Sequence, residues 1–349
     1  MRNLYISTYP ASYRVDLCNV LAERLDCDIY HYVPVDNEAE TLRGARFVNH
    51  RLPTGHLFGK VFPKGLEALV ASSRPSVVFV QEFSFIALRL LQLRKRYSIR
   101  VVSICDDGLD MIQGHDFGRA HRLARQFVPR WLDSLVVSTD AVRQWYRARF
   151  GKGILMPIIA DERRVRPELE RVLPQSERLR PGEKPVVAFV GRLVGLKNIP
   201  TLIRAFEPLK DRAQLVIIGD GPLRDALEAM APDALFTGQL SGDELLAWYN
   251  LIDILVLPST QEAYGAVTGE ALMAGAKVVV SRKAGSADLV REGENGSVVD
   301  PMDAAAITDR IGRLLDTVPS GRPVALRENL LPYRFESCIR NLLEEINAL

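Results

Sequence analysis

Cysteine is scarce in this chain of 349 residues: its four cysteines are scattered and form no CxxC pair. Such spacing is not that of a zinc site or a disulfide framework, so reduced thiols and a cytoplasmic location are expected. Long apolar runs are also missing, since none reaches the roughly 18 to 20 residues that cross a bilayer. The amino-terminal residues show no signal-peptide pattern. No Asp-x-Asp triplet stands at the end of a strand-like run, so no bound metal is expected.

The residues that are abundant are those of a soluble globular protein. Apolar residues make up 47% of the chain and charged residues 25%, which excludes a disordered chain, and the length favours two domains. Residues 1–180 contain 28 basic and 20 acidic residues. The whole chain has 45 basic and 43 acidic residues, so residues 181–349 contain 17 basic and 23 acidic ones. Either the surface charge is uneven, or the amino-terminal half faces an anionic membrane.

Short apolar runs alternate with helical patterns along the whole chain. The runs are continuous, as in parallel strands covered on both faces, and strand–helix alternation predicts parallel sheets with right-handed crossovers. The predicted strands are 4–7, 28–33, 77–80, 100–105, 134–138 and 154–157, followed by 186–191, 214–219, 235–238, 254–258, 277–281 and 297–300.

The alternation breaks once, between residues 161 and 185, where Arg, Glu and Pro dominate without apolar periodicity. We interpret this stretch as a linker between two doubly wound α/β domains, 1–160 and 186–334. Two such domains leave a cleft where the carboxyl ends of both sheets meet, and ligands bind there in folds of this kind.

The first candidate site is the segment VGRLVGLKN, residues 190–198, which leaves a strand and enters a helix. Gly191 and Gly195 let the backbone approach a ligand closely, and a helix amino terminus favours an anion. Arg192 offers a planar fork for phosphate oxygens and Lys197 a mobile charge. The spacing matches neither a Walker loop nor GxGxxG. Taken alone, an ordinary turn with two surface cations is the alternative.

The second candidate site is the segment STQEAYGAVTGE, residues 259–270. Glu262 is expected in a loop after a strand and Glu270 about two turns into the following helix, each placed to accept hydrogen bonds from hydroxyls. The turn at 264–267 would point backbone N–H groups at a ligand. Two unrelated, solvated glutamates are the alternative.

These segments join GDGP at 219–222 and FTG at 236–238 in one series: GRLxxxKN, GDGP, FTG and LPSxxExYGxxxxE. In order and spacing the series resembles the retaining glycosyltransferases of family 4, over most of residues 186–300. The resemblance implies the GT-B fold, in which two Rossmann-like domains face a cleft. It also implies that the first domain binds the acceptor, that the second binds a nucleotide-sugar donor, and that a helix at 335–349 crosses back to the first domain.

The resemblance assigns a role to each motif. Arg192 and Lys197 bind the donor diphosphate, Glu270 holds the ribose hydroxyls, and Glu262 contacts the hexose. The other implied donor-binding positions are Gly191, Tyr264, Gly265 and Ala266 around phosphate and sugar, and Gly238, Gln239 and Leu240 near the base.

The implied activity is metal-independent transfer of a hexose from a UDP- or GDP-linked sugar, a substrate rather than a cofactor. The implied acceptor is a hydroxyl of a glycan or lipid-linked saccharide in cell-surface polysaccharide assembly. Arg192 and Lys197 stabilise charge on the leaving phosphate, and Glu262 positions the sugar without becoming a nucleophile. A nucleotide-sugar epimerase, a phosphorylase or sucrose-type transferase, and a catalytically silent nucleotide-sugar-binding protein are the alternatives.

The segment YPASYRVDL, residues 9–17, is a candidate for the acceptor side. It resembles the YPxxxRxxL start of family members that build bacterial surface polysaccharides. Tyr13 and Arg14 then lie where a helix opens. Arg14 meets an acceptor phosphate or the leaving group, or it points into solvent.

Asp106 and Asp107 follow the predicted strand 100–105, where many relatives carry a histidine in the sugar pocket. No histidine stands there, and His115 comes about eight residues later, so a catalytic histidine is not carried over. The two carboxylates either orient the acceptor hydroxyl or cap a helix.

A basic stretch at 118–129 predicts an amphipathic helix suited to an anionic membrane surface at the inner face of the cell membrane. A charged, solvated helix face is the alternative. Nucleic acid is not expected as a partner, because no nucleic-acid motif accompanies the basic residues. The pattern consists of Arg119, Arg122 and Arg125 with Leu123, Phe127 and Val128 between them.

Overall fold

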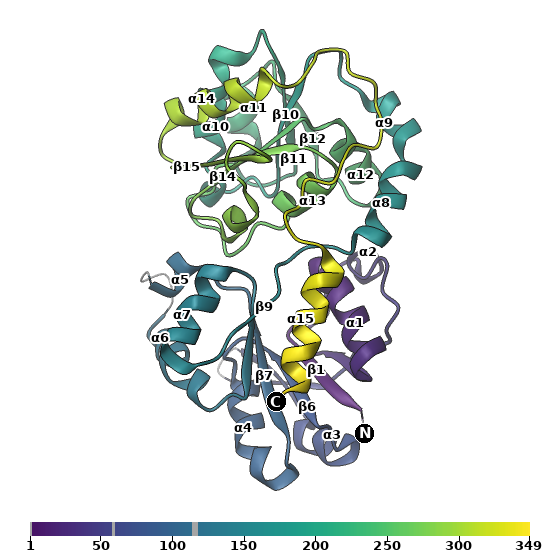
Figure 1. Cartoon of the computed structure of the whole chain (residues 1–349), viewed down its shortest axis with the longest axis vertical. Coiled ribbons are helices and arrows are strands. Elements are labelled where there is room, and N and C mark those ends of the chain that lie inside the picture. The colour runs from purple at the N-terminus through teal and green to yellow at the C-terminus, as the bar shows by residue number, and fades with distance from the viewer. Residues whose placement is uncertain (1, 58–59, 114–117) are drawn as a thin grey trace. The chain divides into compact units, whose positions relative to one another are not determined.

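The structure is a computed structural model that describes residues 2–57, 60–113 and 118–349 (Figure 1). The chain divides into two compact units. Unit 1 contains Met1–Ile158 and Glu336–Leu349, and unit 2 contains Ile159–Phe335. None of the helices in the described ranges is both long and apolar enough to span a membrane.

Unit 1 is built on a seven-stranded parallel sheet with the order β3-β2-β1-β6-β7-β8-β9. The order reverses between β1 and β6, so the chain leaves these neighbouring strands in opposite directions, which opens a crevice at their carboxyl ends. The strands are β1 (Asn3–Ser7), β2 (Cys27–His31), β3 (Asn49–Arg51), β6 (Val77–Gln81), β7 (Arg100–Cys105), β8 (Ser134–Val137) and β9 (Ile154–Leu155).

The central strands of this sheet are apolar and buried along almost their whole length, as the continuous apolar runs predict. A separate antiparallel hairpin pairs β4 (Thr54–Leu57) with β5 (Lys60–Pro63). The helices of unit 1 are α1 (Val15–Leu25), α2 (Glu38–Thr41), α3 (Leu66–Ser73), α4 (Phe85–Tyr97), α5 (Leu109–Gln113), α6 (Arg119–Phe127) and α7 (Asp140–Phe150), with 3₁₀ turns at Ser12–Arg14 and Val128–Arg130.

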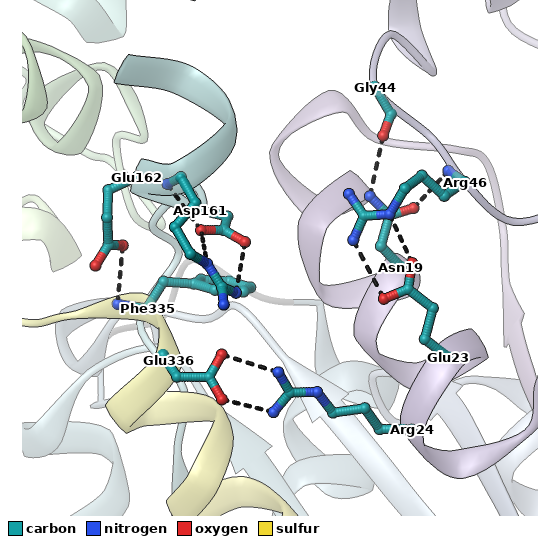
Figure 2. A network of polar contacts seen from close by, with 10 residues as sticks. Asn19, Glu23, Arg24, Gly44, Arg46, Asp161, Glu162, Phe335 and Glu336 are labelled. Carbon is teal, nitrogen blue, oxygen red and sulfur yellow. Dashed lines mark hydrogen bonds and ion pairs between the residues drawn. The ribbon is translucent and has the colours of Figure 1, made fainter. Parts of the chain in front are cut away.

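The last helix of the chain, α15 (Phe335–Asn347), belongs to unit 1 from Glu336 onward, which confirms the predicted return of the carboxyl terminus to the first domain. Glu336 accepts two hydrogen bonds from Arg24 on α1, with N–O distances of 2.6 and 2.9 Å (Figure 2). Where the chain leaves unit 2, the Phe335 N–H donates to Glu162 at 3.2 Å (Figure 2).

Unit 2 is built on a six-stranded parallel sheet with the order β12-β11-β10-β13-β14-β15, which reverses between β10 and β13. Its strands are β10 (Val186–Val190), β11 (Gln214–Ile218), β12 (Leu235–Gly238), β13 (Ile254–Leu257), β14 (Lys277–Ser281) and β15 (Gly296–Val299). Its helices are α8 (Glu162–Arg171), α9 (Leu173–Leu179), α10 (Ile199–Phe206), α11 (Arg224–Met230), α12 (Gly242–Leu251), α13 (Val267–Met273) and α14 (Ala304–Leu315). Short 3₁₀ turns lie at Gly195–Lys197, Glu207–Leu209 and Gly285–Leu289.

The two doubly wound sheets confirm the predicted fold class, and every predicted strand overlaps an observed one. The strands that the sequence did not predict are β3, β4 and β5. They are short, and β3 has the sequence Asn-His-Arg. Polar residues at a sheet edge or in a hairpin leave no apolar run to detect.

The segment 161–185, interpreted as a linker, contains α8 and α9 and lies within unit 2. Leu169, Val172 and Ser176 are buried. The Asn250 amide on α12 donates to the Leu169 carbonyl at 2.8 Å and to the Ser176 hydroxyl at 3.2 Å. Within this segment Leu169 and Val172 are the fully buried large apolar residues, and the Asn250 contact adds a buried polar anchor, so the sequence shows no apolar period.

We expect Asn250→Ala to lower the free energy of unfolding by about 1–3 kcal/mol, because it leaves buried polar groups of α8 and α9 without their partner. Urea denaturation measures the change. Glu177→Ala is the control, since its side chain on α9 is 59% exposed and should change stability by less than about 0.5 kcal/mol. Equal effects of the two changes would show that α8 and α9 are not anchored through Asn250.

Candidate active site

The loops that follow β10 and β13 meet at the point where the strand order of unit 2 reverses. The Thr260 N–H donates to the Leu196 carbonyl at 2.9 Å. The Asn198 side chain donates to the Pro258 carbonyl at 3.2 Å. Both predicted segments, 190–198 and 259–270, are therefore fixed to each other at the carboxyl ends of neighbouring strands, where ligands bind in open parallel sheets.

The loop after β11 packs against the loop after β10 with no room for side chains. A Cβ atom at Gly219 would lie 1.9 Å from the Gly191 carbonyl oxygen, and one at Gly221 would lie 2.6 Å from the Leu193 carbonyl oxygen. Gly219 also has a φ of +136°, which side-chain-bearing residues rarely adopt. The glycines of the GDGP motif are thus required for close contact between two backbones.

Lys197 and Glu262 form an ion pair that joins the two loops. The Ser259 hydroxyl also donates to Glu262, at 3.3 Å. Both charged side chains are largely but not fully buried, so the pair borders solvent. The structure thus brings together two residues that lie 65 positions apart in the sequence.

Arg192 is exposed in the same loop as Lys197, and its guanidinium has no ion-pair partner among the residues that the structure describes. Lys197 closes a 3₁₀ turn (Gly195–Lys197) directly before α10. A free arginine, a lysine and a helix amino terminus at one sheet edge form a positive surface suited to phosphate oxygens.

The turn between β13 and α13 depends on Gly265, whose φ is +91°. A Cβ atom there would lie 2.6 Å from the Leu257 side chain and 3.3 Å from that of Glu262. Ala266 is the residue before the first turn of α13. Tyr264 is buried beneath the turn, and its carbonyl accepts from the Ser286 N–H at 2.8 Å.

Glu270 lies on α13 and accepts a hydrogen bond from the Tyr249 hydroxyl of α12. Gly238 ends β12 with a φ of +78°, and its carbonyl accepts from the Gly219 N–H at 2.8 Å. Gln239 is exposed and Leu240 half-buried just beyond. The predicted donor-binding positions therefore lie at the carboxyl ends of β12, β10 and β13 of one sheet; their individual roles stay predictions.

In unit 1, Arg14 is buried and forms an ion pair with Asp106. The Tyr13 hydroxyl also points at Asp106, at 3.4 Å. Burial, the largest single effect, lowers the pKa of Arg14, but the charge and hydrogen bond of Asp106 together with Tyr5 and Tyr13 raise it above its usual value. The alternative that Arg14 points into solvent is therefore wrong.

Asp107 is buried and paired with Arg125 of α6, at 2.5 and 2.6 Å. The predicted basic face of residues 118–129 is thus wrong in part, because Arg125 and Val128 point inward, whereas Leu123 and Phe127 are exposed. Membrane contact through α6 stays a prediction. His115 and the side chain of Arg119 lie outside the described residues.

Glu82 is a site residue that the sequence analysis missed. It stands directly after β6, and its carboxylate lies 3.8 Å from Arg125. The pKa of Glu82 is raised, first by burial and then by the nearby charge of Asp107, while Arg125 opposes the shift. The sequence held a signal for Glu82, because this carboxylate follows a predicted strand closely, but Glu82 belongs to none of the motifs.

The described residues hold no group of three or more His, Cys, Asp and Glu side chains placed to bind a metal ion. Independence from metal stays a prediction about the reaction.

Comparison with known proteins connects this arrangement to one family. Residues 184–317 match the family described as "Glycosyl transferases group 1". A GDP-mannose-dependent alpha-mannosyltransferase of Corynebacterium glutamicum is 40% identical over 122 residues, 35% of this chain and 29% of that protein. A GDP-mannose-dependent alpha-(1-6)-phosphatidylinositol monomannoside mannosyltransferase of Mycolicibacterium smegmatis is 30% identical over 225 residues, 58% of this chain and 59% of that protein.

The chain thus covers less than two thirds of the length of these first relatives. Among solved structures, Anabaena Alr3699/HepE in complex with UDP has a TM-score of 0.79 over 100% of both chains, at 14% identity. This likeness establishes the two-domain fold.

We expect Gly219→Ala to destabilise unit 2 by about 2 kcal/mol or more, because the added methyl group would overlap the Gly191 carbonyl. Thermal unfolding measures the loss. Gly195→Ala is the control, because a Cβ atom there meets nothing within 4 Å and its φ lies outside the strained region. A Gly219→Ala protein that is as stable as the Gly195→Ala protein would contradict the close packing of the two loops.

Proposed function

We propose that the chain is a glycosyltransferase of the group 1 family, whose model matches residues 184–317, and that it transfers a hexose from a nucleotide sugar to an acceptor hydroxyl. The observation that carries the proposal is the ion pair of Lys197 with Glu262 at the strand reversal of unit 2, with Arg192 exposed in the same loop as Lys197. Cations for phosphate and a carboxylate for sugar hydroxyls are the groups that a nucleotide sugar needs.

The proposed reaction breaks the bond between the sugar C1 and the diphosphate oxygen and forms a bond from C1 to the acceptor oxygen. Negative charge develops on the departing phosphate, and Arg192 and Lys197 stabilise it. The acceptor attacks the face from which the diphosphate leaves, so the anomeric configuration is retained. The proton of the acceptor hydroxyl passes to the leaving phosphate oxygen.

Glu262 has a positioning role in this scheme. Its carboxylate is held by Lys197 and by the Ser259 hydroxyl, an arrangement that stabilises its charge in place. We assign it to the hexose hydroxyls and not to attack on C1. Glu270, held by Tyr249, is assigned to the ribose hydroxyls.

The relatives indicate which donor to test first. The two mannosyltransferases are named as dependent on GDP-mannose, whereas the Anabaena structure holds UDP. We propose GDP-mannose as the first candidate donor and UDP-hexoses as the second. The backbone at Gly238, Gln239 and Leu240 is assigned to the base.

On the acceptor side we assign Tyr13, Arg14, Asp106 and Asp107, which lie at the carboxyl ends of β1 and β7. The proposed acceptor is a hydroxyl of a glycan or of a lipid-linked saccharide. Support for a lipid-linked acceptor comes from the named acceptor of the Mycolicibacterium relative, phosphatidylinositol monomannoside. The proposed setting is cell-surface polysaccharide assembly in the cytoplasm, at the inner face of the cell membrane.

We expect Lys197→Ala and Glu262→Ala each to lower kcat/KM for transfer by about a hundredfold or more in a folded protein. Each change removes a group that contacts the donor. Lys210→Ala and Glu207→Ala are matched controls, because these residues form an exposed ion pair of the same kind in unit 2. Near-normal turnover by either of the first two variants would contradict the donor site.

We expect GDP-mannose or a UDP-hexose to raise the melting temperature, since a ligand at about 100 times its Kd adds about 2.7 kcal/mol to the stability of the folded state. The shift should persist in EDTA, because the cations of the site are side chains. A shift that EDTA abolishes would contradict metal-independent binding.

A further inference from the structure

The carboxyl edge of the unit 1 sheet gathers polar groups that come from four neighbouring strands. Arg14 follows β1, Glu82 follows β6, Asp106 follows β7 and Ser138 follows β8. The strand order reverses between β1 and β6, so Arg14 and Glu82 stand on either side of the crevice that this topology creates.

Several buried polar atoms at this edge have no hydrogen-bond partner in the part of the chain that the structure describes. They are Arg14 Nε, Ser84 Oγ, Ser138 Oγ and Tyr146 Oη. Arg14 is only 6% exposed and Tyr146 fully buried. Buried polar atoms are rarely left without partners, so several at one sheet edge indicate a ligand or ordered water that completes them.

Tyr146 connects these atoms to the charged residues. Its ring centre lies 6.0 Å from that of Phe83, and the Arg125 guanidinium lies over the Phe83 ring, 5.6 Å from its centre. Phe83 follows Glu82 directly, so the unpartnered hydroxyl and the Glu82 carboxylate belong to one neighbourhood.

Glu82 differs from the other two carboxylates of this edge, because both aspartates already form close ion pairs. Asp106 is paired with Arg14, and Asp107 with Arg125. Among the described residues the Glu82 carboxylate has only the long 3.8 Å contact to Arg125, and its side chain is 43% exposed. Its backbone is held in the left-handed region, with φ +54°, while its carbonyl accepts from Ser103 at 2.9 Å.

We propose that this edge is an acceptor subsite for an uncharged, hydroxyl-rich group, in which Glu82 accepts a hydrogen bond from an acceptor hydroxyl. The inference rests on the proposed transfer reaction and adds the chemical class of its acceptor. Arg14 Nε–H and the free hydroxyls donate to the oxygens of the same group.

A hydroxyl-rich ligand fits this edge better than a phosphate does. A hydroxyl both donates and accepts, so a polyol satisfies the unpartnered donors and the Glu82 carboxylate together. A phosphate oxygen only accepts, and it would lie beside a carboxylate whose repulsion no free cation of this group offsets. Both arginines are neutralised by the aspartates. Burial and the negative charge of Asp107, the two main causes that raise the pKa of Glu82, also disfavour a second anion at this position.

The test compares matched acceptors in the whole protein, with the nucleotide sugar that raises the melting temperature most as donor. The acceptors are methyl α-D-mannopyranoside and myo-inositol, each beside its monophosphate. The wild-type kcat/KM should favour the uncharged member by about tenfold or more. In Glu82→Gln this preference should fall by about tenfold, because the amide accepts a weaker hydrogen bond and no longer repels phosphate.

Glu67→Gln is the matched control, since this half-buried glutamate of α3 pairs with Arg89 and Arg96 away from the sheet edge. Glu82→Gly is the second variant. Glycine adopts the φ of +54° without strain, so its melting temperature should equal or exceed that of wild type.

A wild-type preference for the phosphorylated acceptors, or an unchanged preference in Glu82→Gln, would overturn the inference and leave ordered water as the partner of these atoms. A fall of several degrees in the melting temperature of Glu82→Gly would also overturn it, because Glu82 would then be structural. Failure of the proposed function looks different: the wild-type protein would release no nucleoside diphosphate from any donor.

Discussion

The ion pair between Lys197 and Glu262 is the interaction on which the donor site depends. It joins the loops after β10 and β13, the two strands between which the order of the sheet reverses. One backbone hydrogen bond, from Thr260 to Leu196, and one from the Asn198 side chain to Pro258 hold the same loops together. The close contact of Gly219 with Gly191 brings the loop after β11 against the loop after β10, in which Arg192 is exposed.

The two units use arginine differently. In unit 1 the buried arginines Arg14 and Arg125 are neutralised by Asp106 and Asp107. In unit 2 we assign the exposed Arg192 to the donor phosphate. The two pairs of unit 1 add no net charge, so the excess of basic residues in the first half of the sequence comes from other side chains. We propose that the donor site of unit 2 is cationic and that the acceptor subsite of unit 1 excludes anions.

The sequence predicted the parallel sheets, the returning carboxyl-terminal helix and the segments of the donor site. These features could be predicted because apolar runs and glycine motifs are visible in short stretches of the sequence. It did not predict α8 and α9, whose anchor is a polar contact of Asn250 with Ser176 rather than an apolar period. The burial of Arg125 was also missed, because three-residue spacing of arginines looks the same whether one of them meets a buried aspartate or water. Glu82 was missed because its importance comes from neighbours on other strands and from its backbone conformation, and neither is visible in the sequence.

Hydrogen–deuterium exchange of the whole protein with and without a nucleotide sugar tests the central claim most directly. Protection should concentrate in residues 191–198, 219–222, 238–240 and 259–266, the loops at the carboxyl ends of β10, β11, β12 and β13. A cavity of about 270 Å³ lies elsewhere in unit 2, lined by Ile203, Phe206, Gln214 and Met230 among others. Protection confined to that cavity, with the four loops unchanged, would contradict the assignment of the donor site.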